Sequence, residues 1–132
     1  MQNNRIEALL PIAYEALKNN RTITKEGEIE KSLRGQISSF GAAILTGSLS
    51  SAVAFYSVQG RAKTPRQALL EVILEILKHG DLLLDADQAA IKNKTVKDMK
   101  DLVFSSKDPE LQEKIVDASV AIKLAMNFFT LK

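Results

Sequence analysis

The sequence predicts an all-α protein, a single-domain bundle of six or seven helices that spans residues 1–132 and is built around a central helical hairpin. Apolar residues recur at steps of three and four along most of the chain. No segment combines the alternating pattern and β-branched enrichment of a strand. A chain of 132 residues is long enough to bury a core without disulfides, and it contains no Cys.

The central stretch, residues 35–60, contains no charged side chain, although 26% of the sequence is charged. Two interpretations compete: one membrane-spanning helix, or two buried helices that cross at a tight turn. A span needs about 20 predominantly apolar residues, but seven Ser or Thr side chains interrupt residues 37–58. Cations flank both ends, so no positive-inside asymmetry sets an orientation. We therefore favour the hairpin.

Two apolar stripes at helical spacing support the hairpin. The first consists of Ile29, Leu33, Ile37, Phe40 and Ile44, and the second of Leu49, Ala52, Val53 and Tyr56. Gly47 lies between them, and we expect it to end the first helix in a left-handed conformation. Ser48 then caps the second helix. Small residues along this stretch favour a close approach between helices: Gly41, Ala43, Gly47, Ser50, Ser51 and Ala54.

Helices are expected on both sides of the hairpin. The first is read from the apolar residues between Ile6 and Leu17, has Pro11 in its first turn or at a kink, and is ended by Asn19 and Asn20. The second runs from about Thr24 to Leu45. The third covers Leu49 to about Gln59 and stops at Gly60. Thr64-Pro65-Arg66-Gln67 is a capping box with Pro at the first helical position, and it opens a helix that ends in Lys78 and His79 before Gly80.

The last third of the chain predicts three further helices. A short one follows the apolar residues 82–84, with Asp85 and Gln88 at its cap. The next covers residues 96–104. The final helix opens on Asp108 as N-cap and Pro109 and continues to Phe129. On it, Glu110, Glu113 and Asp117 share one polar face, which usually means a solvated surface.

Residues that carry catalysis or bind metal are not recognisable, so we expect no enzyme, no cofactor and no metal. His79, the single His, lies where a helix C-terminus favours a cation. Asp81, Asp85 and Asp87 do not match the spacing of a calcium loop. The serines of the hairpin lack a His or Lys base at a recognisable spacing. The N-terminus lacks the apolar region of a signal peptide, so we expect a cytoplasmic protein.

Positive charge is concentrated in the first half of the sequence. Residues 1–66 contain nine Lys or Arg against five acids, whereas residues 67–132 contain nine against eleven. Five cations flank the uncharged stretch: Lys31, Arg34, Arg61, Lys63 and Arg66. If the two helices of the hairpin are antiparallel, these cations meet at one end of it. They would then neutralise phosphates without reading bases; unrelated surface cations are the equally weighted alternative.

The central segment resembles a known family, the small helical subunit of the type III-B CRISPR RNA-guided effector complex (the Cmr module). The likeness lies in an amphipathic helix, a Gly-containing turn, the small-residue helix of residues 47–56 and the basic segment after it. The terminal helix with Phe128 and Phe129 near its end also fits. Members often carry a Pro ahead of the turn and a Trp in the last helix, and this chain has neither.

The resemblance implies a non-catalytic subunit in antiviral defence. Such a subunit stacks with copies of itself along the backbone subunits and lines the groove that holds guide and target RNA. No catalytic residue is implied, and neither a membrane nor a small-molecule substrate is expected. The alternative is a helical adaptor that binds only protein partners.

Overall fold

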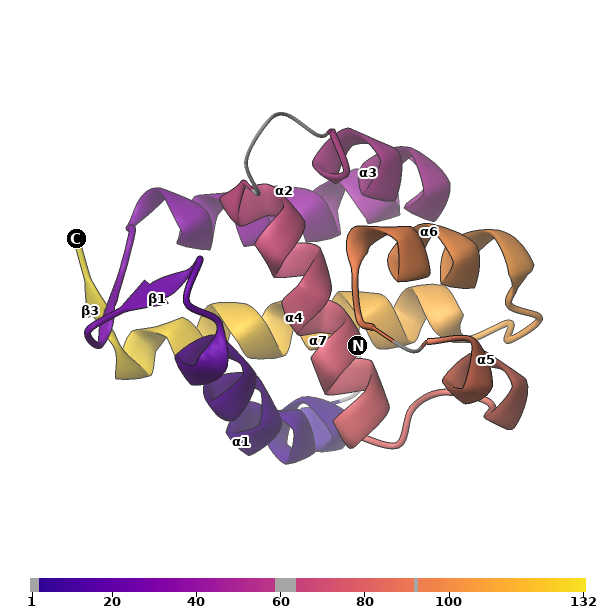
Figure 1. Cartoon of the computed structure of the whole chain (residues 1–132), viewed down its shortest axis with the longest axis horizontal. Helices are drawn as coiled ribbons and strands as arrows, with labels where there is room; N and C mark the ends of the chain where they lie inside the picture. The colour runs from indigo at the N-terminus through magenta and orange to yellow at the C-terminus, as the bar shows by residue number, and fades with distance from the viewer. Residues whose placement is uncertain (1–2, 59–63, 92) are drawn as a thin grey trace.

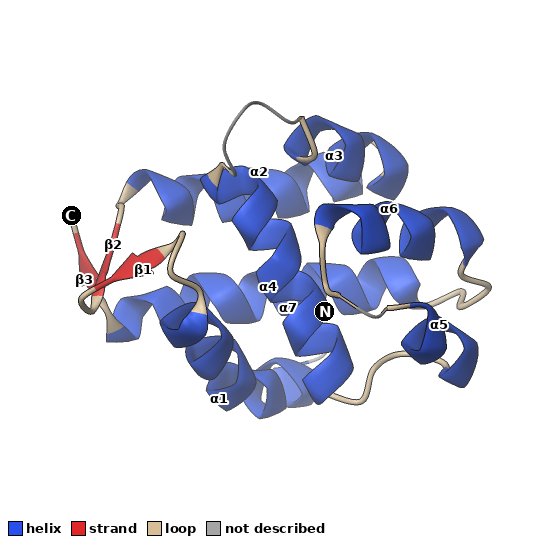
Figure 2. Cartoon of the chain, in the orientation of Figure 1, coloured by secondary structure: helices blue, strands red, loops and turns tan. Residues whose placement is uncertain are grey.

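The structure is a computed structural model that describes residues 3–58, 64–91 and 93–132 (Figure 1). These residues form a predominantly all-α fold with seven α-helices, one short 3-10 helix and a small three-stranded sheet (Figure 2). The elements in chain order are α1 (Asn3–Asn19), β1 (Thr24–Lys25), β2 (Glu28–Ile29), α2 (Ser32–Thr46), α3 (Leu49–Tyr56), α4 (Pro65–His79), α5 (Asp85–Ala90), α6 (Val96–Ser105), α7 (Leu111–Ala125), η1 (Met126–Phe128) and β3 (Thr130–Leu131). The prediction of six or seven helices is confirmed.

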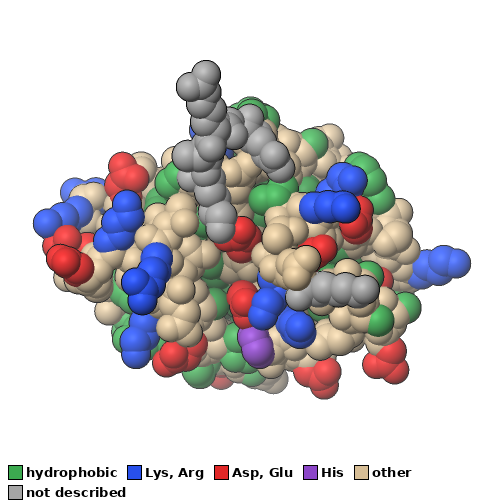
Figure 3. Space-filling model, viewed as in Figure 1, with side chains coloured by type: hydrophobic (Ala, Val, Ile, Leu, Met, Phe, Trp, Pro, Cys, Tyr) green, Lys and Arg blue, Asp and Glu red, His purple; other side chains and the backbone are tan. Residues whose placement is uncertain are grey.

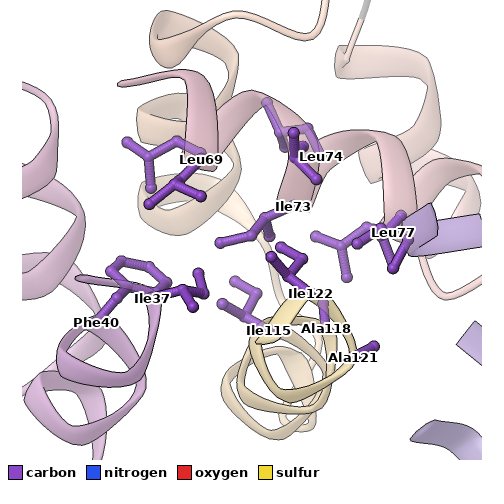
Figure 4. Packing of buried hydrophobic residues seen from close by; sticks show 14 of the residues in the cluster. Ile37, Phe40, Leu69, Ile73, Leu74, Leu77, Ile115, Ala118, Ala121 and Ile122 are labelled. Carbon is purple, nitrogen blue, oxygen red and sulfur yellow. The ribbon is translucent and has the colours of Figure 1, made fainter. Parts of the chain in front are cut away.

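The core is centred on α4 and α7, which cross near the middle of the molecule (Figure 1). Figure 4 shows Ile73 and Leu77 of α4 directed toward Ile122 of α7, with Ile37 and Phe40 of α2 beside them. All five side chains are at most 1% exposed. Because each buried side chain of this size contributes about 1.5–3 kcal/mol, the stripes predicted on α2, α4 and α7 supply much of the driving force for folding.

The helical hairpin forms as α2 and α3, and the chain breaks between them where predicted. Ser48 caps α3, since its Oγ accepts a hydrogen bond from the Ser51 N–H at 3.0 Å. The expected left-handed conformation of Gly47 is wrong, because its φ is −119°. A side chain would be crowded there for another reason: a Cβ on Gly47 would lie 3.0 Å from the carbonyl oxygen of Ala43.

At the end of the hairpin opposite the turn, Tyr56 holds α3 against α2. Tyr56, the last residue of α3, donates a 2.6 Å hydrogen bond to the main-chain oxygen of Gln36 and packs edge-on against Phe40. The two helices are therefore antiparallel. Within the part of the chain that the structure describes, no helix is long and apolar enough to cross a membrane. α3 ends at Tyr56, with Ser57 as its C-cap, so the third helix is shorter than the predicted span to about Gln59; Gln59 and Gly60 themselves lie outside the described residues.

The small residues of the hairpin have different roles. Gly41 is buried, and a Cβ on it would lie 3.2 Å from Ser119 Oγ, so this position lets α2 approach α7 closely. Ser50, Ser51 and Ala54 are exposed along α3. The expectation of close packing is thus confirmed for Gly41 alone among these four positions.

Residues 24–31 do not form the predicted start of a helix. Glu26 and Gly27 both have positive φ (54° and 78°), as a type I′ hairpin turn requires, and they join β1 to β2. β2 then pairs in parallel with β3, with Ile29 opposite Leu131. This pairing also shortens the last helix: α7 ends at Ala125 rather than near Phe129, because the chain turns through η1 to reach the sheet.

The start of α4 agrees with its prediction. Thr64 Oγ1 accepts a hydrogen bond from the Gln67 N–H at 3.3 Å, and Gln67 Oε1 accepts one from the Thr64 N–H at 2.9 Å. Pro65 occupies the first helical position. This reciprocal capping box fixes the direction in which the chain enters the core helix.

The end of α4 is a Schellman motif in which Asp81, not Gly80, is left-handed, with a φ of 56°. The Leu82 N–H bonds to the carbonyl oxygen of Leu77 at 3.0 Å, as this motif requires. Gly80 is needed because of a close approach. A Cβ there would lie 2.7 Å from both a backbone oxygen of α4 and the Leu9 side chain of α1.

Other helix ends differ in part from expectation. α1 ends at Asn19 as predicted, but Pro11 lies inside α1, beyond its first turn. α5 forms, yet Asp85 is its first helical residue and not a cap. α6 begins at Val96 as predicted. α7 begins at Leu111 instead of after Asp108, whose Oδ1 accepts a hydrogen bond from the Glu110 N–H at 2.9 Å.

Asp117 is not on a solvated face. It is fully buried in α7, and its Oδ2 accepts a 3.0 Å hydrogen bond from Arg5 Nη1 of α1. The polar-face prediction failed because α1, α2 and α4 all pack on α7, so that the helix is covered on several sides. Glu110, before the helix, is exposed as expected.

Candidate nucleic-acid interface

The predicted cations lie at the beginnings of two helices. Lys31 is exposed immediately before α2, and Arg34 is half-buried in its first turn. Arg66 is exposed in the first turn of α4. Arg61 and Lys63 lie outside the described residues. Both described helix starts belong to the same end of the hairpin, because α2 and α3 are antiparallel and α4 follows α3.

A groove of about 290 Å³ joins these two helix starts. We call it the α2–α4 groove. It is lined by Glu30, Ser32, Leu33, Gln36, Phe55, Tyr56, Val58, Thr64, Pro65 and Arg66. The structure therefore brings Arg66 next to the start of α2, as the antiparallel hairpin predicts. Lys31 and Arg34 do not line the groove. Among the described residues, Arg66 is therefore the only cation in its lining.

Arg66 stacks on aromatic rings. Its guanidinium carbon lies 5.1 Å from the ring centroid of Phe55 and 5.8 Å from that of Tyr56. Phe55 is 59% exposed, so one side of this stack faces solvent. Stacking orients a guanidinium through its face, which leaves the N–H groups on its edge available to acceptors such as phosphate oxygens.

Tyr56 fixes the floor of the groove. Burial raises the pKa of the Tyr56 phenol, and the positive charge of Arg66 partly offsets this. The hydroxyl therefore keeps its proton near neutral pH and donates it to the backbone of α2 at Gln36. Because this bond ties the end of α3 to α2, the two rings beneath Arg66 have a defined position relative to the start of α2.

The electrostatic character of this end is positive but mixed. Neither α2 nor α4 has an acidic residue in its first turn, and each has an Arg there. The positive ends of both helix dipoles are thus reinforced rather than compensated. Glu30 opposes this locally at the groove wall. Figure 3 shows Lys and Arg interspersed with Asp and Glu across the visible face, so charge density alone does not mark one patch.

Two polar groups beside the groove lack partners among the described residues. The Nε of Arg34 is buried without a hydrogen-bond acceptor, and the Oε1 of Gln36 is buried without a donor. Buried polar atoms are normally paired, and each exception asks for an explanation. Both residues belong to the first turns of α2, the segment predicted to face a polyanion.

No protein-family model, curated protein or solved structure matches this chain. What the groove binds must therefore be inferred from its shape, its exposed side chains and its charge.

Outside the α2–α4 groove, the titratable side chains that the sequence singled out contact neighbouring residues. His79 is the last residue of α4, as predicted, and its Nε2 lies 2.9 Å from Glu75 Oε2. Glu75 also pairs with Lys94 at 2.9 Å. Asp87 is buried and accepts a 2.6 Å hydrogen bond from Ser106 Oγ. Across the described ranges, no group of three or more His, Asp or Glu side chains could hold a metal ion.

Sequence reasoning missed the aromatic part of the groove. Phe55 and Val58 are 59% and 68% exposed beside Arg66. A signal was present, because Phe55 falls outside the apolar stripe of its helix and its exposure follows from that offset. The contact of Arg66 with this ring depends on where α4 lies relative to α3, which helical periodicity does not encode.

Proposed function

We propose that this protein is a non-catalytic small subunit of a cytoplasmic type III-B CRISPR (Cmr) ribonucleoprotein effector complex. In this role it stacks with copies of itself along the backbone subunits and lines the groove for guide and target RNA. The α2–α4 groove faces the RNA backbone. Lys31, Arg34, Arg61, Lys63 and Arg66 supply the positive charge.

One observation carries the RNA part of the proposal: Arg66 is stacked on the exposed Phe55 at the end of the hairpin where α2 and α4 both begin. A guanidinium that lies over an aromatic ring keeps its N–H groups available to a phosphate, and an exposed ring suits an unpaired base. The segment that carries the family resemblance, residues 47–56, folds as the turn and second helix of the hairpin. The groove is partly open to solvent and is not an enclosed cavity, which leaves room for an extended strand.

Contacts of this kind are few in each molecule. An isolated subunit should therefore bind RNA weakly, and linked copies should bind it more strongly through their effective concentration. The interaction should be independent of sequence and steeply dependent on salt, because each neutralised phosphate releases counterions.

The test uses a reconstituted complex and target RNA across a salt series. The variant carries Glu at Arg34, Arg61, Lys63 and Arg66. A matched control carries the same four charge reversals on cations that do not line the groove: Lys18, Lys25, Lys107 and Lys123. The groove variant should bind RNA more weakly and with a flatter salt slope than the control, although both change the net charge equally.

Incorporation of each variant into the complex is measured in parallel, so that a lost subunit is not mistaken for lost contacts. Arg34 and Lys123 are half-buried, so circular dichroism and thermal unfolding of both variants are measured first, and the RNA comparison uses variants that keep the wild-type fold. Equal RNA affinity and equal salt slope for the groove variant and wild type, with the subunit incorporated, would remove these residues from the RNA site.

That outcome would favour the second candidate, a helical adaptor that binds only protein. The observation that favours it is a set of apolar side chains that expose between 59% and 70% of their surface: Leu45, Phe55, Val58 and Phe104. A single exposed apolar residue is ordinary on a protein surface, so only their combined presence favours a protein partner. The two candidates separate on whether the assembled protein retains RNA.

A further inference from the structure

A second groove lies between α3 and α6, which run beside each other in Figure 1. It has a volume of about 450 Å³, and its exposed surface is mostly apolar. We call it the α3–α6 groove. Its walls are formed by Ser50, Val53, Ala54 and Ser57 of the α3 segment and by Val96, Lys97, Lys100 and Phe104 of α6. None of these residues lines the α2–α4 groove.

The α3 wall is suited to contact with another helix. Residues 50, 53, 54 and 57 follow the i, i+3, i+4, i+7 spacing of one helix face. Ser50 and Ala54 are exposed and small, so an incoming backbone can approach closely. Val53 is 3% exposed at the base and gives the groove an apolar floor.

The α6 wall provides an anchor and a charge. Phe104 is 70% exposed, although most aromatic rings of this size gain from burial. Lys97 and Lys100 extend along the same wall, and among the described residues the ion-pair partner of Lys100 is Asp101, at a long 3.6 Å. The facing α3 segment belongs to the uncharged stretch. The charged rim of the groove is therefore positive and confined to one side.

We infer that the α3–α6 groove binds an amphipathic helix of a protein partner, with apolar anchors on one face and Asp or Glu on one flank. Laying such a helix into a groove between two helices is a recurrent recognition mode. The one-sided charge sets the orientation: apolar anchors face Val53 and Ala54, and the acidic flank faces Lys97 and Lys100. This inference does not depend on RNA binding, because the two grooves share no lining residue.

The experiment selects peptides from a displayed library of 16-residue amphipathic helices whose polar flanks are randomised. The bait is the full chain. Enriched peptides should carry Asp or Glu on one flank only. Affinity for a selected peptide, measured by fluorescence anisotropy, should fall at least tenfold with Ala54→Arg, which fills the groove while keeping a good helix former on an exposed position.

Charge and anchor are tested separately. Lys97→Glu with Lys100→Glu should weaken binding of the acidic peptide and strengthen binding of the same peptide with Lys in place of its acids. Phe104→Ala should weaken binding of both peptides, the acidic one and the one with Lys. Phe128→Ala is the matched control, because Phe128 is 69% exposed but does not line this groove.

Several results would overturn the inference. Selection of peptides without an acidic flank, or binding that Ala54→Arg leaves unchanged, would show that the groove does not hold an acidic helix. Sedimentation tests another occupant: if the wild-type chain self-associates and Ala54→Arg abolishes this, the groove holds a second copy instead. Circular dichroism and thermal unfolding of each variant confirm that the fold is intact.

Discussion

The buried ion pair between α1 and α7 leads to a quantitative prediction for stability. Asp117 is fully buried, and Arg5 Nη1 lies 3.0 Å from its Oδ2. The other oxygen, Oδ1, has no hydrogen-bond partner among the described residues. Arg5→Met keeps much of the apolar length of the side chain but removes the donor and the charge. The Asp117 carboxylate then stays buried without a partner.

The expected cost follows from the burial of both partners. Breaking a buried pair on one side costs about 3–5 kcal/mol. The Arg5 side chain is 19% exposed, so water reaches part of this site, and we expect the lower end, about 3 kcal/mol. For a chain of this length that corresponds to a decrease in Tm of roughly 10 °C. Adding Asp117→Leu should restore most of the loss, because apolar replacement of both partners is often close to neutral.

The assay is urea unfolding of wild type, both single variants and the double variant, which gives the coupling energy directly. Arg21→Met is the matched control, since Arg21 is exposed, and it should change the free energy of unfolding by less than about 0.5 kcal/mol. If Arg5→Met costs no more than this control, the reasoning from burial fails.

Three further predictions concern helix ends and pH. Gly80→Ala should lower the Tm, because its Cβ would lie 2.7 Å from a backbone oxygen, whereas Asp81→Gly should not, because φ at Asp81 is 56°. Gly47→Val should also lower the Tm, since a Cβ there meets a backbone oxygen at 3.0 Å; an unchanged Tm would mean that the turn rearranges freely. Burial raises the pKa of Asp108, but hydrogen bonds and the charge of Lys114 outweigh this and lower it below its ordinary 3.8. The folded pKa is the lower one, so the pair stabilises the protein above about pH 4, and this contribution is lost as pH falls through the folded pKa. Urea titrations should therefore show the advantage of wild type over Asp108→Asn shrinking below that pH; a constant difference would contradict the assignment.

Helices were predictable where local signals agreed. The capping box at Thr64 and the apolar stripe behind it gave α4 its correct start and end, because both signals lie within one segment. The strand pairing of Ile29 with Leu131 joins residues far apart in sequence. The only local signal for it was the Glu26-Gly27 turn. The helical apolar stripe that includes Ile29 predicted a helix there instead.

The prediction that Asp117 lies on a solvated face also failed, because this charged side chain is buried. On α7 the spacing of Asp117 suggested a polar face, and only the crossing of α1 shows that Arg5 meets it there. Periodicity reports how many faces of a helix are apolar, but a fully covered helix can keep one carboxylate if a cation reaches it. The sequence spacing of Arg5 and Asp117 carries no such information.

The candidate site was predictable in its location and less so in its composition. An antiparallel hairpin places the start of α2 beside the start of α4, and this followed from the two stripes. The separation of Arg34 from the groove did not follow, because it depends on the rotation of α2 about its axis. Leu33 and Gln36 line the groove, whereas Arg34 does not.

The cations at this end of the molecule are poorly placed for folding, and this supports a role in binding. Cations in the first turn of a helix oppose its dipole, at about 0.3–1 kcal/mol each. Arg34 and Arg66 both occupy such positions, and neither α2 nor α4 has an acid in its first turn to compensate. Reversing these two charges removes the unfavourable dipole term but also the contact of Arg66 with the Phe55 ring, two effects of similar size, so the free energy of unfolding should change little. If the same reversal weakens RNA retention by the assembled complex, binding is lost while stability holds, and that is the expected behaviour of residues that serve a polyanion rather than the fold.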